Sequence, residues 1–326
     1  MAKKRVTIKD LANETGLSAQ AVSRALRGKD DIAPATRQKV LDTAERLGYI
    51  KNLAASSLKA GRSRLIAVVY DNLLNPYFSI MTEYLQEYLT KFGYSILVLT
   101  VPRGRINKKA FHLAVSRGVD GVITFLEPEC DMGELARAHE VPIILLGRST
   151  DHPNIDYLKT DDRTGGAMAA ARLVDSGCKR PLCVVENLEL TCAKERFDGY
   201  REELIARGLF DPQMVIVLND TKMGSGYDEI KRRGLDPDGI FCFNDIVALE
   251  IASQVRNDGA DIKIVGYDNI QADIKIPYRL TTIGSDKQQM ASVAAEVLIY
   301  KMENPENMGK PFKKLHEVFL VEGESG

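Results

Sequence analysis

The residues of this sequence that could do chemistry follow short apolar runs of the kind that form buried strands. Asp71 comes directly after LIAVVY, Arg148 after PIILLG and Asp268 after IKIVGY. Asn244 and Asp245 follow GIFCF. In parallel sheets, ligands bind beyond the carboxyl ends of the strands, so we expect these side chains to meet at one site. Arginine, amide and carboxylate groups make paired hydrogen bonds to adjacent hydroxyls and are costly to bury unpaired, which favours a polyhydroxylated ligand.

A catalytic use of the same groups is the main alternative. Asp245 and Asp268 could act as acid and base in a sugar-processing cleft. The sequence contains no GxSxG, HExxH or GxxxxGK[ST] motif, and GSGYDE at residues 224–229 lacks the last glycine of GxGxxG. The four histidines have no ligand spacing and the five cysteines form no CxxC pair, so we expect reduced thiols, no metal and no cofactor. These absences favour binding over catalysis.

Charge is unevenly distributed along the 326 residues. Residues 1–62 hold 13 Lys or Arg against 6 Asp or Glu, a net charge of +7, and the rest of the chain has a net charge of −8. A small basic segment on an acidic body points to a polyanionic partner, with a solvated basic face as the alternative. The beginning, MAKKRVTIKD, has no apolar signal region and no run could span a bilayer, so we expect a cytoplasmic protein with no membrane partner.

The basic segment has the pattern of three short helices. Thr7 and Asp10 resemble a capping box for the first helix, and Gly16 permits the left-handed turn that ends it. Ser18 can cap the second helix, and residues 35–47 form the third. This spacing is typical of a helix-turn-helix, with a three-helix bundle of no DNA role as the alternative. The inward side chains are expected to be Ile8, Leu11, Ala12, Ala21 or Val22, Ala25, Val40, Leu41, Ala44 and Leu47.

The second helix of a helix-turn-helix enters the major groove, and the residues near its beginning meet the base edges. Gln20 can bond adenine through two hydrogen bonds, Arg24 can reach guanine or phosphate, and Ala19 can touch only a thymine methyl. Ser18 and Ser23 are expected beside them on the exposed side. Phosphate contacts, which position the protein without specifying sequence, are expected from Lys3, Lys4, Arg5, Arg27 and Arg37.

From residue 64 onward, apolar runs alternate with helical patterns. This alternation predicts parallel sheets covered by helices on both faces. VDGVITF at residues 119–125 is echoed by PDGIFCF at residues 237–243, so we expect two similar doubly wound lobes that meet at a cleft. The helices expected between the strands include residues 78–91, 163–176, 193–207 and 245–258.

The segment TIKDLANETGLSAQAVSRALRGKDDIAPATRQKVLDTAERLGYIKN resembles the DNA-binding head of the lactose/galactose-repressor (LacI/GalR) family at nearly every position. The resemblance implies a helix-turn-helix domain at residues 1–50 and a hinge at residues 51–63. Residues 64–326 are then a two-lobed, periplasmic-binding-protein-like body that binds an effector and forms a homodimer. An extracytoplasmic solute-binding protein would share the body but not the basic head.

The resemblance also implies a role for the hinge. In the family this segment folds into a short helix on the operator, and the two hinges of a dimer lie in the minor groove. By position, Leu58 would wedge into the central base step, with Ala55 and Lys59 beside it, and Thr7 would join the DNA contacts of the head. Ser56 stands where the family usually has arginine.

The body carries the resemblance over residues 64–322. Tyr77 and Phe78 would offer an aromatic face to the effector, with core packing as the alternative. Arg196, in ERFDGY, matches a position that holds polar groups of the effector, as do the strand-end residues Asn244, Asp245 and Asp268. Cys192 stands where threonine is common.

Three departures from the family pattern bear on the effector. Gly147 replaces a common acid, Leu190 replaces an arginine of purine-responsive members, and Thr221 replaces their stacking phenylalanine. Together they argue against a purine and for a sugar, leaving a protein corepressor or a non-sugar metabolite as the alternative. The expected partner is a near-palindromic operator bound by a homodimer, and the sequence decides neither the effector nor repression against activation.

Overall fold

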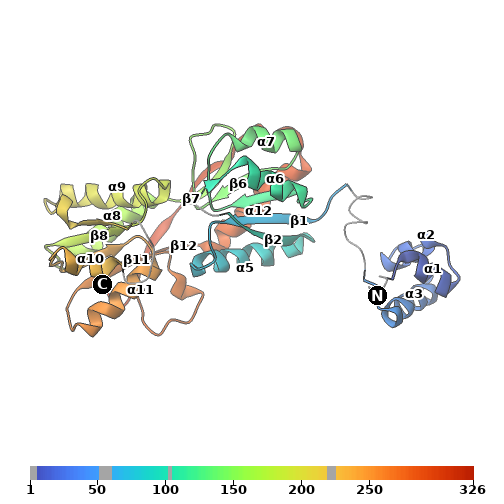
Figure 1. The fold of residues 1–326 in the computed structure, drawn as a ribbon, viewed down its shortest axis with the longest axis horizontal. Coiled ribbons are helices and arrows are strands. Elements are labelled where there is room, and N and C mark those ends of the chain that lie inside the picture. Colours follow the sequence, from blue (N-terminus) through green and yellow to red (C-terminus); the bar gives the residue numbers. More distant parts are fainter. Residues whose placement is uncertain (1–5, 51–60, 102–104, 219–224) are drawn as a thin grey trace. The chain divides into compact units, whose positions relative to one another are not determined.

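The chain forms two compact units, Met1–Ser63 and Arg64–Gly326 (Figure 1). The predicted minor-groove residues Ala55, Leu58 and Lys59 lie outside the part of the chain that the computed structural model describes. Among the described helices, none combines the length and the apolar composition that a membrane-spanning helix requires. The described part comprises residues 6–50, 61–101, 105–218 and 225–326.

The first unit is a bundle of three helices whose ends are set by local hydrogen bonds. Thr7 accepts a hydrogen bond from the backbone N–H of Asp10, whose carboxylate accepts one from the backbone N–H of Thr7, so the predicted capping box is formed. Gly16 follows the first helix with φ of 71°, and Ser18 caps the second through the N–H of Ala21 at 3.1 Å. The helices are α1 Ile8–Thr15, α2 Ala19–Leu26 and α3 Pro34–Leu47.

The centre of this bundle is apolar and well enclosed. Leu11, Val22 and Val40 are fully buried, one from each helix. The inward residue of α2 is therefore Val22, and Ala21 is only partly buried. The expectation that Leu41 covers the other helices is wrong, because it lies one residue around α3 from Val40 and is 42% exposed.

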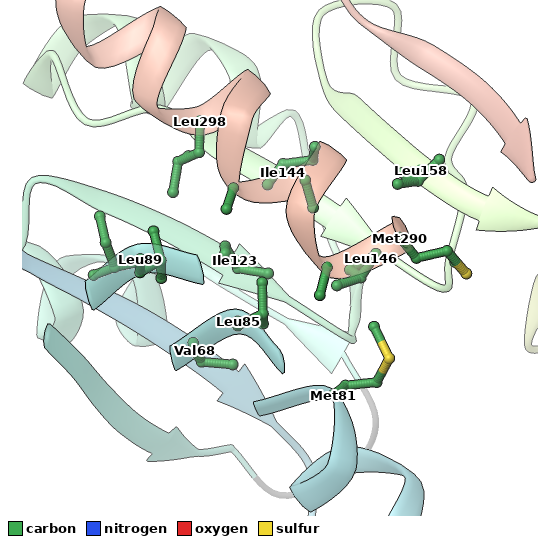
Figure 2. Packing of buried hydrophobic residues seen from close by; sticks show 14 of the residues in the cluster. Val68, Met81, Leu85, Leu89, Ile123, Ile144, Leu146, Leu158, Met290 and Leu298 are labelled. Carbon is green, nitrogen blue, oxygen red and sulfur yellow. The ribbon is translucent and has the colours of Figure 1, made fainter. Parts of the chain in front are cut away.

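The first lobe of the body is a parallel sheet with helices on both faces (Figure 1). Its strand order is β13-β7-β6-β4-β1-β2. Helices α5 and α12 cover one face, where Val68, Met81 and Leu298 belong to one buried cluster (Figure 2), and α6 and α7 cover the other. The elements are β1 Leu65–Tyr70, α5 Pro76–Lys91, β2 Ser95–Thr100, α6 Lys108–Ser116, β4 Gly121–Thr124, α7 Met132–His139, β6 Ile143–Leu146, β7 Asp156–Thr160, α12 Lys287–Glu303 and β13 Lys313–His316.

The second lobe repeats this architecture, as the echoed sequence runs predict. Its strand order is β14-β12-β11-β10-β8-β9, with β14 antiparallel to β12 at the edge. Helices α8 and α9 pack on one face and α10 and α11 on the other. The elements are α8 Asp162–Asp175, β8 Pro181–Val185, α9 Thr191–Ala206, β9 Val215–Val217, α10 Ser225–Arg232, β10 Gly239–Cys242, α11 Asp245–Asn257, β11 Lys263–Tyr267, β12 Thr281–Ser285 and β14 Val318–Val321.

The chain crosses between the lobes from β7 into α8, from β12 into α12 and from β13 into β14. The carboxyl ends of strands from both sheets are thereby joined by short connections. Two strands that the sequence pattern did not predict, β3 (Arg105–Ile106) and β5 (Glu127–Pro128), pair with each other in parallel. Single 3₁₀ turns lie at Pro212–Met214, Ile270–Ala272 and Pro305–Asn307.

Two glycines let α8 and α9 pack in backbone contact. A Cβ atom at Gly166 would lie 1.9 Å from the backbone oxygen of Arg196, and one at Gly199 would lie 1.8 Å from the backbone oxygen of Arg163. A side chain at either position would push the helices apart. This close approach holds α9, and with it Arg196, against the beginning of α8 at Asp162.

Candidate functional site

The predicted DNA-contacting residues of the head lie on the outer side of α2. Ala19 and Gln20 are exposed, and Ser23 and Arg24 are partly exposed. A hollow of about 260 Å³ is lined by Gln20, Arg24, Arg27 and Lys29. Three cationic side chains and one amide thus share one surface, a combination suited to phosphates and base edges.

Several of these predicted contacts are engaged within the head. The hydroxyls of Thr7 and Ser18 bond to the beginnings of their own helices. The guanidinium of Arg24 forms an ion pair with Asp31, in the connection before α3. Part of the positive charge of Arg24 is therefore offset by a carboxylate of its own chain.

In the body, Arg196 of α9 connects the ends of three elements of the second lobe. Its Nε donates to the carboxylate of Asp162 at 2.8 Å, and its Nη1 donates to the backbone oxygen of Phe243 at 2.6 Å. The guanidinium lies 3.5 Å from the centroid of the Tyr267 ring, and Nη2 is 3.5 Å from the carboxylate of Asp268. Its Nε and Nη1 thus donate inside the protein, and Nη2, beside Asp268, is the nitrogen that a ligand can share.

Asp268 lies in a strained turn at the carboxyl end of β11. Its φ is 102° and that of Asn269 is 47°, values that side-chain-bearing residues rarely adopt. Lys287, at the beginning of α12, donates to the backbone oxygens of both residues at 3.1 and 3.0 Å and pairs with Asp273 at 3.0 Å. Burial raises the pKa of the Asp268 carboxyl to about 6, although the neighbouring Arg196 opposes the rise.

Tyr77 and Phe78, at the beginning of α5, have different surroundings. Phe78 is 7% exposed and packs edge-on against Phe125, contacts that are those of a core residue. The hydroxyl of Tyr77 points toward Gly147, where an added Cβ would lie 3.8 Å away. Burial raises the pKa of Tyr77, and the carboxylate of Asp268 in the other lobe raises it further. Tyr77 therefore faces charged groups of the second lobe.

Arg148 and Cys192 are electrostatic neighbours although they belong to different lobes. Arg148 follows β6, and its Nη1 donates to the backbone oxygen of Gly147 at 2.9 Å. Cys192 lies in the first turn of α9 and is 6% exposed. Burial raises the pKa of the Cys192 thiol, while the guanidiniums of Arg148 and Arg196 lower it.

Asn244 and Asp245 have structural roles at the beginning of α11. The side-chain oxygen of Asn244 accepts a hydrogen bond from the N–H of Val247 at 2.9 Å and caps the helix. The carboxylate of Asp245, 1% exposed, accepts hydrogen bonds from the N–H of Ile270 and the hydroxyl of Thr282, at 2.8 and 2.5 Å. The expectation that Asp245 clamps an effector hydroxyl is therefore corrected: its two oxygens hold β12 and the turn after β11 in place.

Two carboxylates at the strand ends were missed by the sequence reasoning. Asp162 is fully buried and holds Arg196. Glu186 follows β8, and burial raises the pKa of its carboxyl. The guanidinium of Arg148 lowers this pKa and the carboxylate of Asp71 raises it. Both residues come directly after or close to an apolar strand. A search for polar residues that follow such strands, which identified Asp71, could therefore have found them.

The site is equipped for binding. Charged groups of the second lobe act electrostatically on Tyr77 of the first lobe, near the strand ends. The carboxylate of Asp245 accepts hydrogen bonds from Ile270 and Thr282, so it is poorly placed to act as an acid or base. No group of three His, Cys, Asp or Glu side chains that could hold a metal ion occurs within the described residues. A helix-turn-helix head and a two-lobed ligand-binding body together define a ligand-controlled DNA-binding regulator.

Comparison with known proteins identifies the family within this class. Residues 7–52 match the family described as "Bacterial regulatory proteins, lacI family". Residues 63–313 match "Periplasmic binding proteins and sugar binding domain of LacI family". The chain belongs to the LacI family: it is a DNA-binding repressor of the LacI type, controlled by an effector, and it is not an enzyme.

Individual relatives match over nearly the whole chain. The HTH-type transcriptional repressor PurR of Aliivibrio salmonicida (strain LFI1238) is 28% identical over 323 residues, 96% of this chain and 97% of its own. The lac repressor dimer bound to operator and the anti-inducer ONPF is 25% identical, with a TM-score of 0.82 and 99% of both chains covered. The transcriptional regulator CelR in complex with cellobiose shares the fold, with a TM-score of 0.69, 24% identity, and 99% of this chain and 100% of that chain covered. These matches confirm the family that the head sequence resembles.

Proposed function

We propose that the effector of this repressor is a small polyhydroxylated molecule, a sugar in the first instance, bound between the two lobes of the body. The observation that carries the proposal is the mutual approach of polar groups from both lobes. Arg196 and Asp268 of the second lobe act electrostatically on Tyr77 of the first, and Arg148 of the first lobe acts on Cys192 and Asp268 of the second. A ligand that bonds to members of both sets would favour the closed arrangement of the lobes.

The turn at Asp268 supports this assignment. Backbone strain of this kind is held in place by its surroundings and clusters at ligand-binding sites. Here Lys287 holds both backbone oxygens of the turn, which keeps the backbone of Asp268 in this conformation. A carboxylate 3.5 Å from a guanidinium nitrogen suits two adjacent hydroxyls of a sugar.

A non-sugar metabolite is the second candidate. Similarity over 96% of the chain to a repressor named PurR makes nucleobases the first compounds to compare with sugars. The departures noted above still speak against a purine. Leu190 directly precedes α9, and its apolar side chain makes no hydrogen bond to that helix. Thr221 lies outside the described residues.

For the DNA half, we propose a cytoplasmic homodimer whose heads read the two halves of a near-palindromic operator. The lac repressor relative, solved as a dimer on its operator, supports this arrangement. Leu58→Ala is expected to weaken operator binding far more than binding to random DNA, because a minor-groove wedge acts only where the central step can open. An equal loss on both DNAs would contradict the wedge.

The effector proposal is tested by thermal unfolding of the full chain against pentoses, hexoses, disaccharides, sugar phosphates and nucleobases. A ligand at 100 times its dissociation constant adds about 2.7 kcal/mol of stability, enough for a shift of several degrees. Tyr77→Phe keeps the ring and removes the hydroxyl, and is expected to reduce the shift. The matched control is Tyr300→Phe, at a residue that is 53% exposed on α12. A ligand whose shift survives both Tyr77→Phe and Asp268→Asn binds elsewhere.

A further inference from the structure

The side chain of Tyr84 reaches from the first lobe of the body to the second. Tyr84 lies on α5, and its hydroxyl donates a hydrogen bond to the carboxylate of Asp273, which directly follows the 3₁₀ turn Ile270–Ala272 of the second lobe. This hydrogen bond raises the pKa of Tyr84 to about 12. Because the two residues belong to different lobes, the bond exists only while the lobes lie together.

The carboxylate of Asp273 also contacts a second helix of the first lobe. Nζ of Lys287, the first residue of α12, lies 3.0 Å from it, and the lysine side chain is only 4% exposed. The same nitrogen donates to the backbone oxygens of Asp268 and Asn269 at 3.1 and 3.0 Å. The lysine that holds the strained turn of the candidate effector site therefore also binds the partner of Tyr84.

The two contacts of Asp273 differ in how the chain constrains them. Only Asp286 separates Lys287 from β12 of the second sheet, so Lys287 belongs to a covalent crossover between the lobes. The helix α5 is joined at both ends to strands of the first sheet, β1 and β2. A rotation that separates the lobes can leave Lys287 beside the turn, whereas it carries Tyr84 away from Asp273.

We propose that the hydrogen bond between Tyr84 and Asp273 is an interlobe latch, a contact that favours the closed arrangement of the two lobes and sets how often they open. An effector bound between the lobes would bind the arrangement that the latch stabilises. Loss of the latch would then weaken effector binding by the factor by which the closed population falls. This consequence rests on the proposed location of the effector site, but the latch itself does not, and it holds for an effector of any chemical class.

A second contact between the lobes can report their opening independently. The carboxylate of Glu127, on β5 of the first lobe, accepts a hydrogen bond from the backbone N–H of Thr191, the first residue of α9 in the second lobe. This contact shares no helix or strand with the latch. Opening of the lobes breaks both contacts, whereas local loosening around Tyr84 leaves the contact of Thr191 intact. Hydrogen exchange of the Thr191 amide therefore measures opening at a place that Tyr84 does not touch.

The test is amide hydrogen exchange of the full chain carrying Tyr84→Phe, which keeps the ring and removes the hydroxyl. Exchange of the Thr191 amide is expected to accelerate on the order of tenfold, because a hydrogen bond to a charged group is lost from the closed arrangement. The matched control is Tyr88→Phe. Tyr88 lies one turn further along α5 and donates to Glu296 of α12 at 2.6 Å, within the first lobe, so its loss should leave the Thr191 amide unchanged.

Variants of Asp273 separate the latch from a local packing effect. Asp273→Ala should accelerate the Thr191 amide as well, and Tyr84→Phe added to it should have little further effect, because both side chains act through one bond. Asp273→Asn keeps an oxygen that can accept from Tyr84 and should restore most of the protection. Acceleration by Tyr84→Phe that is confined to the turn around Asp273 would refute the latch. Equal acceleration of the Thr191 amide by Tyr84→Phe and Tyr88→Phe would refute it too.

Discussion

Glu127 of the first lobe accepts a hydrogen bond from the backbone N–H of Thr191 in the second lobe, at 2.6 Å. Thr191 is the first residue of α9, and Leu190 before it offers that helix no side-chain cap. A carboxylate at a helix N-terminus satisfies an unpaired N–H and interacts favourably with the helix dipole. The helix that carries Cys192 and Arg196 is thus capped by the opposite lobe.

Removal of this cap is expected to loosen α9. Glu127→Ala should lower the free energy of unfolding by about 1–2 kcal/mol, because the charge-assisted hydrogen bond that caps α9 is lost. Urea unfolding of the full chain measures the change, and amide hydrogen exchange in the first turn of α9 should accelerate. Glu129→Ala, at an exposed residue of the same segment, is the control and should change neither measurement.

The packing of α8 on α9 is expected to tolerate no side chain at Gly199. Gly199→Ala would place a Cβ 1.8 Å from the backbone oxygen of Arg163, so one helix must move. We expect a loss of about 3 kcal/mol or more, at the upper end of the range for overpacking because the obstacle is backbone. Gly309→Ala meets no atom within 4 Å and should be nearly neutral, and a similar small loss in both variants would contradict the close approach.

Much of the fold follows from the sequence pattern. LIAVVY and most of its counterparts are uninterrupted apolar runs that form buried strands of two parallel sheets, as such runs do when helices cover both faces, whereas SILVLT forms the edge strand β2 and is not buried. The pairing of β3 with β5 could not be predicted, because strands of two residues have no periodicity to detect. The misplaced Leu41 shows a similar limit on α3, because the apolar pattern does not tell which of the adjacent Val40 and Leu41 is buried.

The strain at Asp268 has a measurable consequence. Asp268→Ala and Asp268→Gly both remove the carboxylate, but only glycine adopts a φ of 102° without steric cost. The glycine variant should therefore be more stable than the alanine variant by about 1 kcal/mol. Thermal unfolding of the two variants measures the difference, and equal stabilities would mean that the turn is not strained.

The candidate site was only partly predictable, for a physical reason. Asp245 and Asp268 both follow apolar strands, so the sequence gives them equal standing as ligand contacts. They differ because Ile270 and Thr282, distant along the chain, fold back onto the carboxylate of Asp245 and leave that of Asp268 without such partners. Hydrogen bonds between segments so far apart leave no trace in a local pattern.

The stability of the body should depend on pH through these carboxyls. The pKa of Asp268 is about 6 and that of Asp245 about 7, both raised by burial above the ordinary value near 4. Between pH 4 and pH 7 the folded state therefore binds more protons than the unfolded state, so the free energy of unfolding falls as pH rises. Asp268→Asn should reduce this fall by on the order of 2 kcal/mol between about pH 4.5 and pH 7.5. Urea unfolding at the two pH values measures it, and the exposed Asp151→Asn should leave the slope unchanged.

In the head, the ion pair between Arg24 and Asp31 should restrain DNA binding. The two side chains are 41% and 46% exposed, so the pair is worth no more than about 1 kcal/mol. Asp31→Asn frees the guanidinium and is expected to tighten binding to operator and random DNA alike by about two- to fivefold at low salt, an effect that salt should diminish. Fluorescence anisotropy with labelled duplexes measures both affinities.

The control is Asp30→Asn, which removes the same charge from an exposed neighbour. Only the gain in affinity of Asp31→Asn beyond that of Asp30→Asn reports the ion pair. Weaker binding of operator alone in Asp31→Asn would mean instead that Asp31 orients Arg24 for a base.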